Sequence, residues 1–362
     1  MSAKEFQTVL ENAYVALDGG ALLEAKDHLQ QARKLDPDHR DVGLLEIDLL
    51  DSEGLGEEAV LACEDLLHAF DDDLLVQYRH ATLLLDTYED VEHARPLLEE
   101  VFRALENGAA VKLAGDAVGS EDEQASFRLD LLLTLADCRT ADGDVEGAFT
   151  AASSAVSLNP SDPMAHITLA TIEFEGGKLE NSLKNTQKAA DLEPLLPDAH
   201  WLKGRILTMQ GAFKEADEAF QRAVTSAPDR FTMPFKLKEN IDVSELLERG
   251  FLELPNRLAE YMRQLQVEIE DLPSVERLSN QETPMPPSAL AALTNEAVLA
   301  QDGVEPLSVW PQSVTVYRRN LEIASESEEE LIDLMIDALL HEVAYFFGQS
   351  VHALVEEAAE DR

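Results

Sequence analysis

The residues best suited to chemistry lie near the C-terminus, where the chain reads Leu340-His341-Glu342-Val343-Ala344-Tyr345. On a helix, the pattern H-E-x-x-H places two histidines one turn apart, where they bind zinc, and its glutamate activates a water molecule. Here His341 and Glu342 stand in the first two positions, and Tyr345 occupies the place of the second histidine. Whether this site supports catalysis depends on that one position.

The elements around this motif suggest a small α+β unit. A helix is predicted from Ser327 into His341, because apolar residues recur along it with helical spacing. Residues 266–270 and 313–319 alternate between apolar and polar side chains, which is typical of strands. Ahead of them, residues 243–264 form an amphipathic helical pattern that is interrupted near Pro255.

The order of these features resembles the minimal zincin-like metallopeptidase family of bacteria, over roughly residues 242–355. The family's helix reads like H-E-x-A-H-H-F-G, followed by an acidic residue three positions after the glycine. The resemblance implies that His341 is the first zinc ligand and Glu342 the catalytic base. It also implies that Tyr345 replaces the second ligand and that Val351 stands in place of the acidic ligand, with His352 one residue further on.

Two readings of this domain follow. Catalytic zinc usually needs three protein ligands, and a neutral phenol is a poor substitute for imidazole, so we expect that zinc binding and peptidase activity are lost and that no cofactor is bound. In the alternative, the protein is an active zinc-dependent metallopeptidase in which His341, Tyr345 and His352 hold the metal and Glu342 is the base.

The first two thirds of the chain repeat with a fixed period. Pro160, Pro194 and Pro228 fall 34 residues apart. Small residues recur at fixed offsets before them: Ala136, Ala170 and Gly204; Ala148, Ser182 and Ala216; Ala155, Ala189 and Ala223. Small side chains let two antiparallel helices cross closely, and proline ends the second helix. This pattern resembles the tetratricopeptide repeat (TPR), of which we count about six units, with a loop or a short extra helix inserted near residues 107–124.

Stacked repeats of this kind form a curved solenoid whose concave face binds a peptide or a helix of a partner protein. The candidate partner-binding positions in the last two units are Met164, Ile167, Thr171, Trp201 and Arg205. Ordinary packing inside the solenoid is the alternative for each of them.

The composition limits the class of partner. The formal net charge is −44, from 28 basic and 72 acidic side chains, which argues against binding to nucleic acid or to an anionic membrane. Cys63 and Cys138 are the two cysteines, so no disulfide framework is expected. The sequence shows neither an apolar signal core at its start nor an uncharged run long enough to span a bilayer, and a cytoplasmic location is therefore predicted.

Together these patterns predict a mostly α protein with a TPR-type α-solenoid over residues 1–228, a linker over 229–241 and a small α+β zincin-like domain over 242–362. We expect a protein-interaction protein. A scaffold that acts through its acidic solenoid alone is a further possibility.

Overall fold

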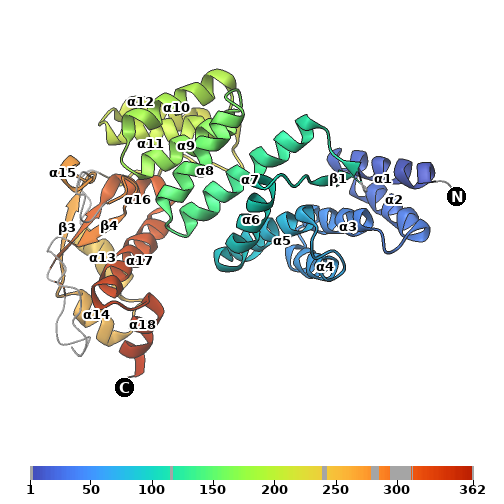
Figure 1. Cartoon of the computed structure of the whole chain (residues 1–362). Coiled ribbons are helices and arrows are strands. Elements are labelled where there is room, and N and C mark those ends of the chain that lie inside the picture. Colours follow the sequence, from blue (N-terminus) through green and yellow to red (C-terminus); the bar gives the residue numbers. More distant parts are fainter. Residues whose placement is uncertain are drawn as a thin grey trace. The chain divides into compact units, whose positions relative to one another are not determined.

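The computed structural model describes residues 3–114, 117–238, 243–278, 285–293, 311 and 313–360. The contacts divide the chain into two compact units, Met1–Leu169 and Ala170–Arg362. The predicted architecture is confirmed, because paired helices come first along the chain and a small α+β region follows (Figure 1). The boundaries expected at residues 228 and 242 remain predictions.

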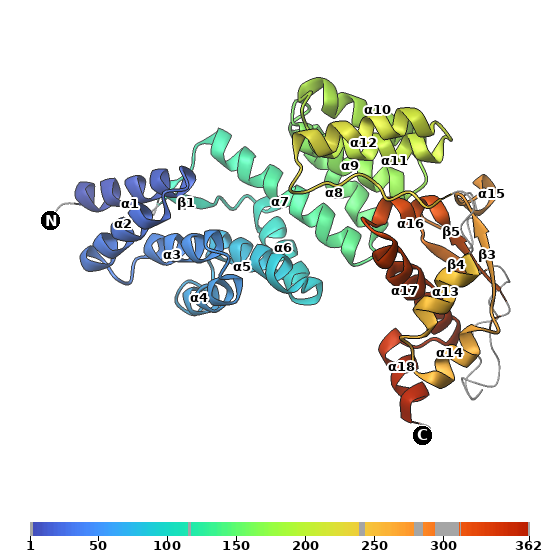
Figure 2. The same cartoon turned by 180° about the vertical axis from the view of Figure 1, so that it is seen from behind.

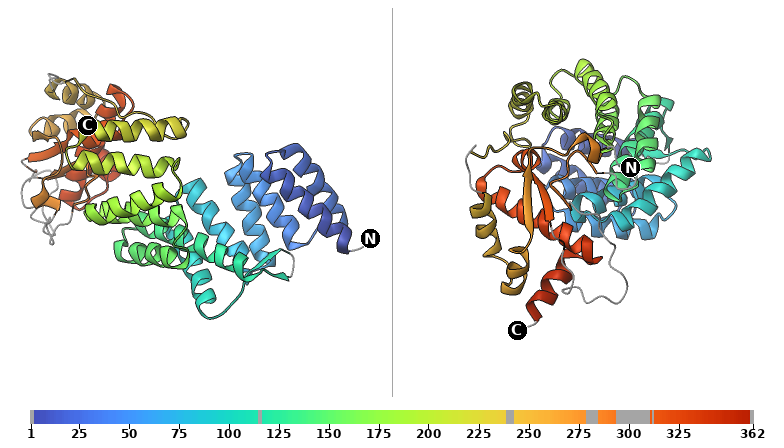
Figure 3. Two further views of the ribbon diagram at one scale, coloured as in Figure 1. Left: turned by 90° about the horizontal axis from the view of Figure 1, so that it is seen from above. Right: turned by 90° about the vertical axis from the view of Figure 1, so that its left-hand side faces the viewer.

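The first unit is built from consecutive helix pairs that lie side by side (Figure 3, left). Its helices are α1 Ala3–Asp18, α2 Leu22–Leu35, α3 Arg40–Ser52, α4 Gly56–Ala69, α5 Leu74–Tyr88, α6 Val91–Glu106, α7 Glu121–Ala141 and α8 Val145–Leu158. Helix α9, Pro163–Glu175, contains the boundary between the units. Side chains cap several of these helices; Asp73, for example, accepts hydrogen bonds from the backbone amides of Leu75 and Val76 at the start of α5.

The tight turn within each helix pair needs one residue in the left-handed conformation. Glycine supplies it in five pairs, at Gly20, Gly54, Gly143, Gly177 and Gly211. In the pair α5–α6 the position is taken by Glu89, whose φ of 53° is the one positive value for a non-glycine residue in the described chain. Gly20 and Gly54 fall 34 residues apart, and so do Gly143, Gly177 and Gly211 in turn, which is a second repeat signal beside the spacing of the prolines and small residues.

The insertion before α7 is a short hairpin, where a loop or a short helix was expected. Strands β1 Lys112–Ala114 and β2 Ala117–Val118 pair in antiparallel fashion. Ser120 and Glu123 form a capping box that starts α7 at Glu121, so the end of the expected loop is helical. The buried guanidinium of Arg40 anchors the hairpin by donating to the carbonyl of Lys112 at 2.9 Å.

The second unit begins with the end of α9 and continues with further repeat helices. These are α10 Leu179–Leu192, α11 Pro197–Met209 and α12 Phe213–Ser226. The nine small residues that carried the repeat prediction are all buried. Close approach is clearest at Gly204 of α11, where an added Cβ would lie 2.5 Å from the ring of Phe220 on α12.

The C-terminal part of the second unit packs helices against a sheet of three described strands (Figure 2). Its helices are α13 Val243–Phe251, α14 Asn256–Met262, α15 Val275–Leu278, α16 Arg318–Ala324, α17 Glu328–Phe347 and α18 Val351–Glu360. The strands are β3 Gln266–Glu270, β4 Ala291–Leu293 and β5 Ser313–Tyr317, in the order β3-β5-β4, with β3 parallel and β4 antiparallel to β5. The second predicted strand is shorter than expected, because α16 begins at Arg318.

The core of this region lies between the sheet and the helices. Val314 and Val316 of β5 join Leu258, Met262, Leu331, Met335 and Leu339 in one buried cluster. The segment after α12 adds Leu237 to that cluster. The backbone of Leu237 is held on both sides, since its amide donates to Glu322 at 3.1 Å and its carbonyl accepts from Arg318 at 2.7 Å. Residues 239–241 of the predicted linker lie outside the described residues.

Among the described helices, none combines the length and the apolar character that crossing a bilayer would require.

Candidate functional site

Helix α17 carries the motif near its C-terminal end. The side chain of Ser327 caps its first turn by accepting from the amide of Glu330, and a buried stripe that includes Leu331, Met335 and Leu339 fixes which face meets the core. The helix ends after Phe347 because Gly348 adopts a left-handed conformation with φ of 64°. His341 and Glu342 therefore occupy the last two turns, next to each other on a rigid element.

Glu342 is half-buried and points to strand β4. Its Oε2 accepts a hydrogen bond of 2.9 Å from the backbone amide of Leu293, the last residue of that strand. Burial raises the pKa of Glu342 above the ordinary carboxyl value, and the Leu293 amide and the nearby His341 lower that pKa in part. The carboxylate that would serve a peptidase as base thus has a backbone partner.

His341 and Tyr345 lie one turn apart on the exposed side of α17. The Tyr345 side chain is 66% exposed, although it fills the position of a histidine ligand. A metal ligand is usually held in place by packing and by hydrogen bonds from neighbouring groups. Because Tyr345 is exposed, little of its side chain is held by packing in this way.

The following helix, α18, carries the last two candidate positions. Val351 is half-buried and packs against the core cluster, so the position of the acidic ligand contains an apolar side chain turned to the interior. His352 is 81% exposed, and its Nε2 lies 3.3 Å from Glu356 on the same helix. His352 therefore has an acidic neighbour of its own.

These donors do not fit a zinc site with three protein ligands. His341 supplies one imidazole, Tyr345 a phenol, and Val351 no donor atom. Within the residues that the structure describes, no group of three or more histidine, cysteine, aspartate or glutamate side chains could hold a metal ion.

The predicted partner-binding residues differ in exposure. On the part of α9 in the first unit, Met164 is 42% exposed and Ile167 is buried. On the part in the second unit, Thr171 is half-buried. Trp201 and Arg205 lie one turn apart on α11, and Trp201 contacts the rings of Phe220 and Phe231. Ile167 and Trp201 have packing roles, whereas Met164 offers free surface.

Arg205 belongs to a cluster that the sequence did not reveal. Its Nη2 donates to Glu175 at 2.7 Å, and its guanidinium lies 4.5 Å from the ring centre of Phe174. The other carboxylate oxygen of Glu175 accepts from the hydroxyl of Ser288. Ser288 is 113 residues away along the chain, so no local pattern could have found this contact.

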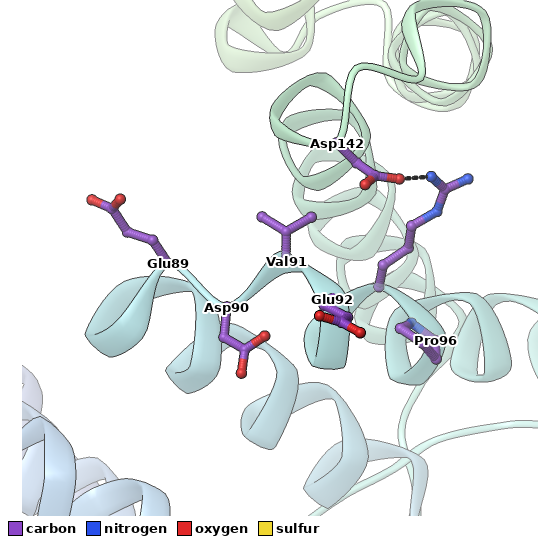
Figure 4. A pocket seen from close by; sticks show the side chains of 7 residues that line it. Glu89, Asp90, Val91, Glu92, Pro96 and Asp142 are labelled. Atoms are coloured by element: carbon purple, nitrogen blue, oxygen red, sulfur yellow. Dashed lines mark hydrogen bonds and ion pairs between the residues drawn. The ribbon is translucent and has the colours of Figure 1, made fainter. Parts of the chain in front are cut away.

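A separate open pocket of about 570 Å³ lies in the first unit at the start of α6 (Figure 4). Glu89, Asp90, Glu92 and Asp142 line it together with Arg95. Arg95 pairs with Asp142, and Asp90 caps the helix by accepting from the amide of His93. The pocket is acidic and shares no residue with the motif on α17.

Two family models match the chain. Residues 262–359 match the zincin-like metallopeptidase model, and residues 78–239 match the tetratricopeptide repeat-like domain model. The chain therefore carries a TPR-like domain followed by a zincin-like metallopeptidase domain. No curated protein matches it.

Solved structures align with part of the chain. The structure of PilW, a type IV pilus biogenesis factor, aligns with a TM-score of 0.52 and 14% identity over 63% of this chain and 96% of PilW. PilF of Pseudomonas aeruginosa aligns with a TM-score of 0.49 and 14% identity over 62% of this chain and 93% of PilF. YrrB, a TPR protein with an unusual peptide-binding site, gives 0.39 and 18% over 56% of this chain and 93% of YrrB. At this identity the PilW match supports the fold alone.

Proposed function

We propose that the chain is a protein-interaction protein whose solenoid binds a protein or peptide and whose zincin-like domain has lost zinc binding and peptidase activity. The domain then serves as a structural or binding module. The observation that carries this proposal concerns the residues at the ligand positions: Tyr345 is exposed at one, and the half-buried Val351 packs against the core at the other.

The position of Glu342 supports the same reading. A general base must accept a proton from the attacking water, and the hydrogen bond from the Leu293 amide uses one of its carboxylate oxygens. The carboxylate of Glu342 can therefore act as an anchor for the end of β4 without metal ligands beside it.

The solenoid supplies the interaction part of the proposal. Repeat solenoids present extended surfaces to partners, and the strongly acidic composition disfavours nucleic acids and anionic membranes as those partners. Met164, Thr171, Trp201 and Arg205 are the predicted positions that retain some exposure.

Metal analysis tests the loss of zinc. The full chain, purified without chelators and dialysed against micromolar zinc, should retain far less than one equivalent. The matched positive control is Tyr345→His combined with Val351→Glu, which restores the ligand types of the family pattern. Stoichiometric zinc in the unaltered chain that disappears in His341→Ala would favour the alternative, an active metallopeptidase, and peptide hydrolysis abolished by Glu342→Gln would establish it.

Peptide selection tests the interaction part. The full chain should select peptides from a random library, and their binding should weaken at least tenfold in Arg205→Ala. Arg222→Ala, an exposed change on α12, is the control and should leave binding unchanged. Selected peptides that bind Arg205→Ala as tightly as the unaltered chain would exclude this surface as their binding site.

A further inference from the structure

We propose that residues 287–293, here called the bridging segment, couple the Arg205–Glu175 pair of the last repeats to Glu342 on α17. All of these residues lie in the second unit. The coupling is a conformational device that depends neither on bound zinc nor on an identified partner. It gives the last repeats a physical route to the motif helix.

The first end of the bridging segment is held by the repeats. Ser288 donates its hydroxyl to Glu175, and the same carboxylate accepts from Arg205 at 2.7 Å through its other oxygen. Both oxygens of Glu175 are thus engaged. A ligand that pairs with Arg205 or with Glu175 competes with these bonds and changes the hold on Ser288.

The middle of the bridging segment has little freedom. The Asn320 side chain is buried and donates to the carbonyls of Pro287 and Ala289, both at 2.7 Å. The amide of Tyr317 donates to Leu290 at 2.8 Å, and β4 then pairs with β5 in one register. We therefore expect the bridging segment to move as a rigid unit when one of its ends is displaced, because few of its backbone groups can adjust separately.

The second end reaches the motif. Leu293 closes the bridging segment, and its amide donates to Glu342 at 2.9 Å. This hydrogen bond joins the carboxyl group of Glu342 to the last residue of β4, so a change in the position of β4 changes the environment of Glu342 directly. By linkage, loss of the Glu342 contact must in turn weaken the hold of the segment on Glu175.

Hydrogen exchange of the Leu293 amide in the full chain tests the coupling. Ser288→Ala removes the donor to Glu175 and should speed the exchange of Leu293 at least fivefold. Glu175→Gln keeps an acceptor but removes the charge, and it should give a smaller increase. Thr225→Ala removes a hydroxyl that bonds within its own helix, and it should leave the exchange unchanged.

The two contacts must also act together. If the bridging segment couples them, Ser288→Ala combined with Glu342→Ala should exchange at Leu293 no faster than Glu342→Ala alone. If the two substitutions each raise the exchange rate of Leu293 by a factor and the factors multiply in the double variant, the two contacts are independent and the proposal is overturned. A change of less than twofold in Ser288→Ala and Glu175→Gln, with circular dichroism showing both folded, would overturn it as well. Neither result depends on zinc content or peptide binding, so the proposed function is tested separately.

Discussion

The carboxylate of Glu342 lies 2.9 Å from the backbone nitrogen of Leu293, and this contact joins the motif helix to the end of strand β4. In a zinc peptidase the same side chain would face a metal-bound water. Here it satisfies a backbone donor at the edge of the described sheet. The residue therefore has a structural role that can be measured without any substrate.

Two substitutions of Glu342 should separate the contribution of its hydrogen bond with Leu293 to stability from the contribution of its charge. Glu342→Gln keeps an oxygen that accepts from Leu293, whereas Glu342→Ala leaves this amide without that partner. We expect Glu342→Ala to lower the free energy of unfolding by about 1–3 kcal/mol. Glu342→Gln should cost less than Glu342→Ala, as measured by denaturant unfolding. Equal losses would show that the hydrogen bond contributes nothing.

The charge of Glu342 should affect how the stability of the folded chain depends on pH. Burial raises its pKa in the folded state, so the unfolded chain releases this proton first and stability falls as pH rises through the folded pKa. The difference in thermal stability between Glu342→Gln and the unaltered chain should therefore shift in favour of Glu342→Gln as pH rises above the ordinary carboxyl pKa. A difference that does not change with pH would contradict this.

The Arg40–Asp73 pair should matter far more than surface pairs in the first unit. Arg40 is buried, its Nη1 lies 2.8 Å from Asp73, and Asp73 also caps α5. Asp73→Ala leaves a buried charge without that partner, and we expect a loss of about 3–5 kcal/mol in unfolding free energy. Arg33→Ala, which breaks an exposed pair with Glu46, should cost about 0–1 kcal/mol. Similar losses in Asp73→Ala and Arg33→Ala would contradict the larger contribution expected of the buried Arg40–Asp73 pair.

Replacing either of two glycines with alanine should lower the stability of the chain, because helices cross closely at both positions. An added Cβ at Gly250 would lie 2.3 Å from Ile336, and one at Gly204 would lie 2.5 Å from Phe220. Alanine favours a helix by about 1 kcal/mol, but overpacking costs about 1–3 kcal/mol, so a net loss is expected. The combination of Gly204→Ala with Phe220→Leu should lose less than the sum of the single changes, and a strictly additive result would count against the clash.

Replacing Glu89 with glycine should stabilise the folded chain. It holds the left-handed position that glycine takes in the other described repeat turns. That conformation costs an L-residue about 1–2 kcal/mol, and the greater backbone freedom of unfolded glycine offsets about half of the relief. Glu89→Gly should thus stabilise the chain by about 0.5–1 kcal/mol. Glu92→Gly, inside the first turn of α6, should destabilise it instead; the reverse order would refute the strain at Glu89.

The two cysteines should report unfolding of the first unit. Cys63 and Cys138 are both buried, and burial raises the pKa of Cys63 to about 12 and that of Cys138 in the same direction. The reactive thiolate is therefore scarce at pH 8. Ellman's reagent should label neither thiol in the folded chain and both in denaturant. Rapid labelling without denaturant would show that the helix packing around them opens readily.

Local and periodic features of the sequence determined the helical solenoid, the strand at residues 266–270 and the helix that carries the motif. Small residues spaced by 34 positions must pack where helices cross, and Ser327 and Gly348 mark the ends of α17 through their own backbone preferences. The hairpin at 112–118 was missed, because its strands are short and its anchor, Arg40, lies far away along the chain.

The sequence also determined which donor atoms the motif offers, since His341 and Tyr345 are read directly from it. Tertiary structure decided what those side chains do. Whether Glu342 faces water or the Leu293 amide, and whether Arg205 is free or paired with Glu175, depends on residues 49 and 30 positions away. Such contacts follow from how the chain packs in three dimensions, which no local spacing of residue types records.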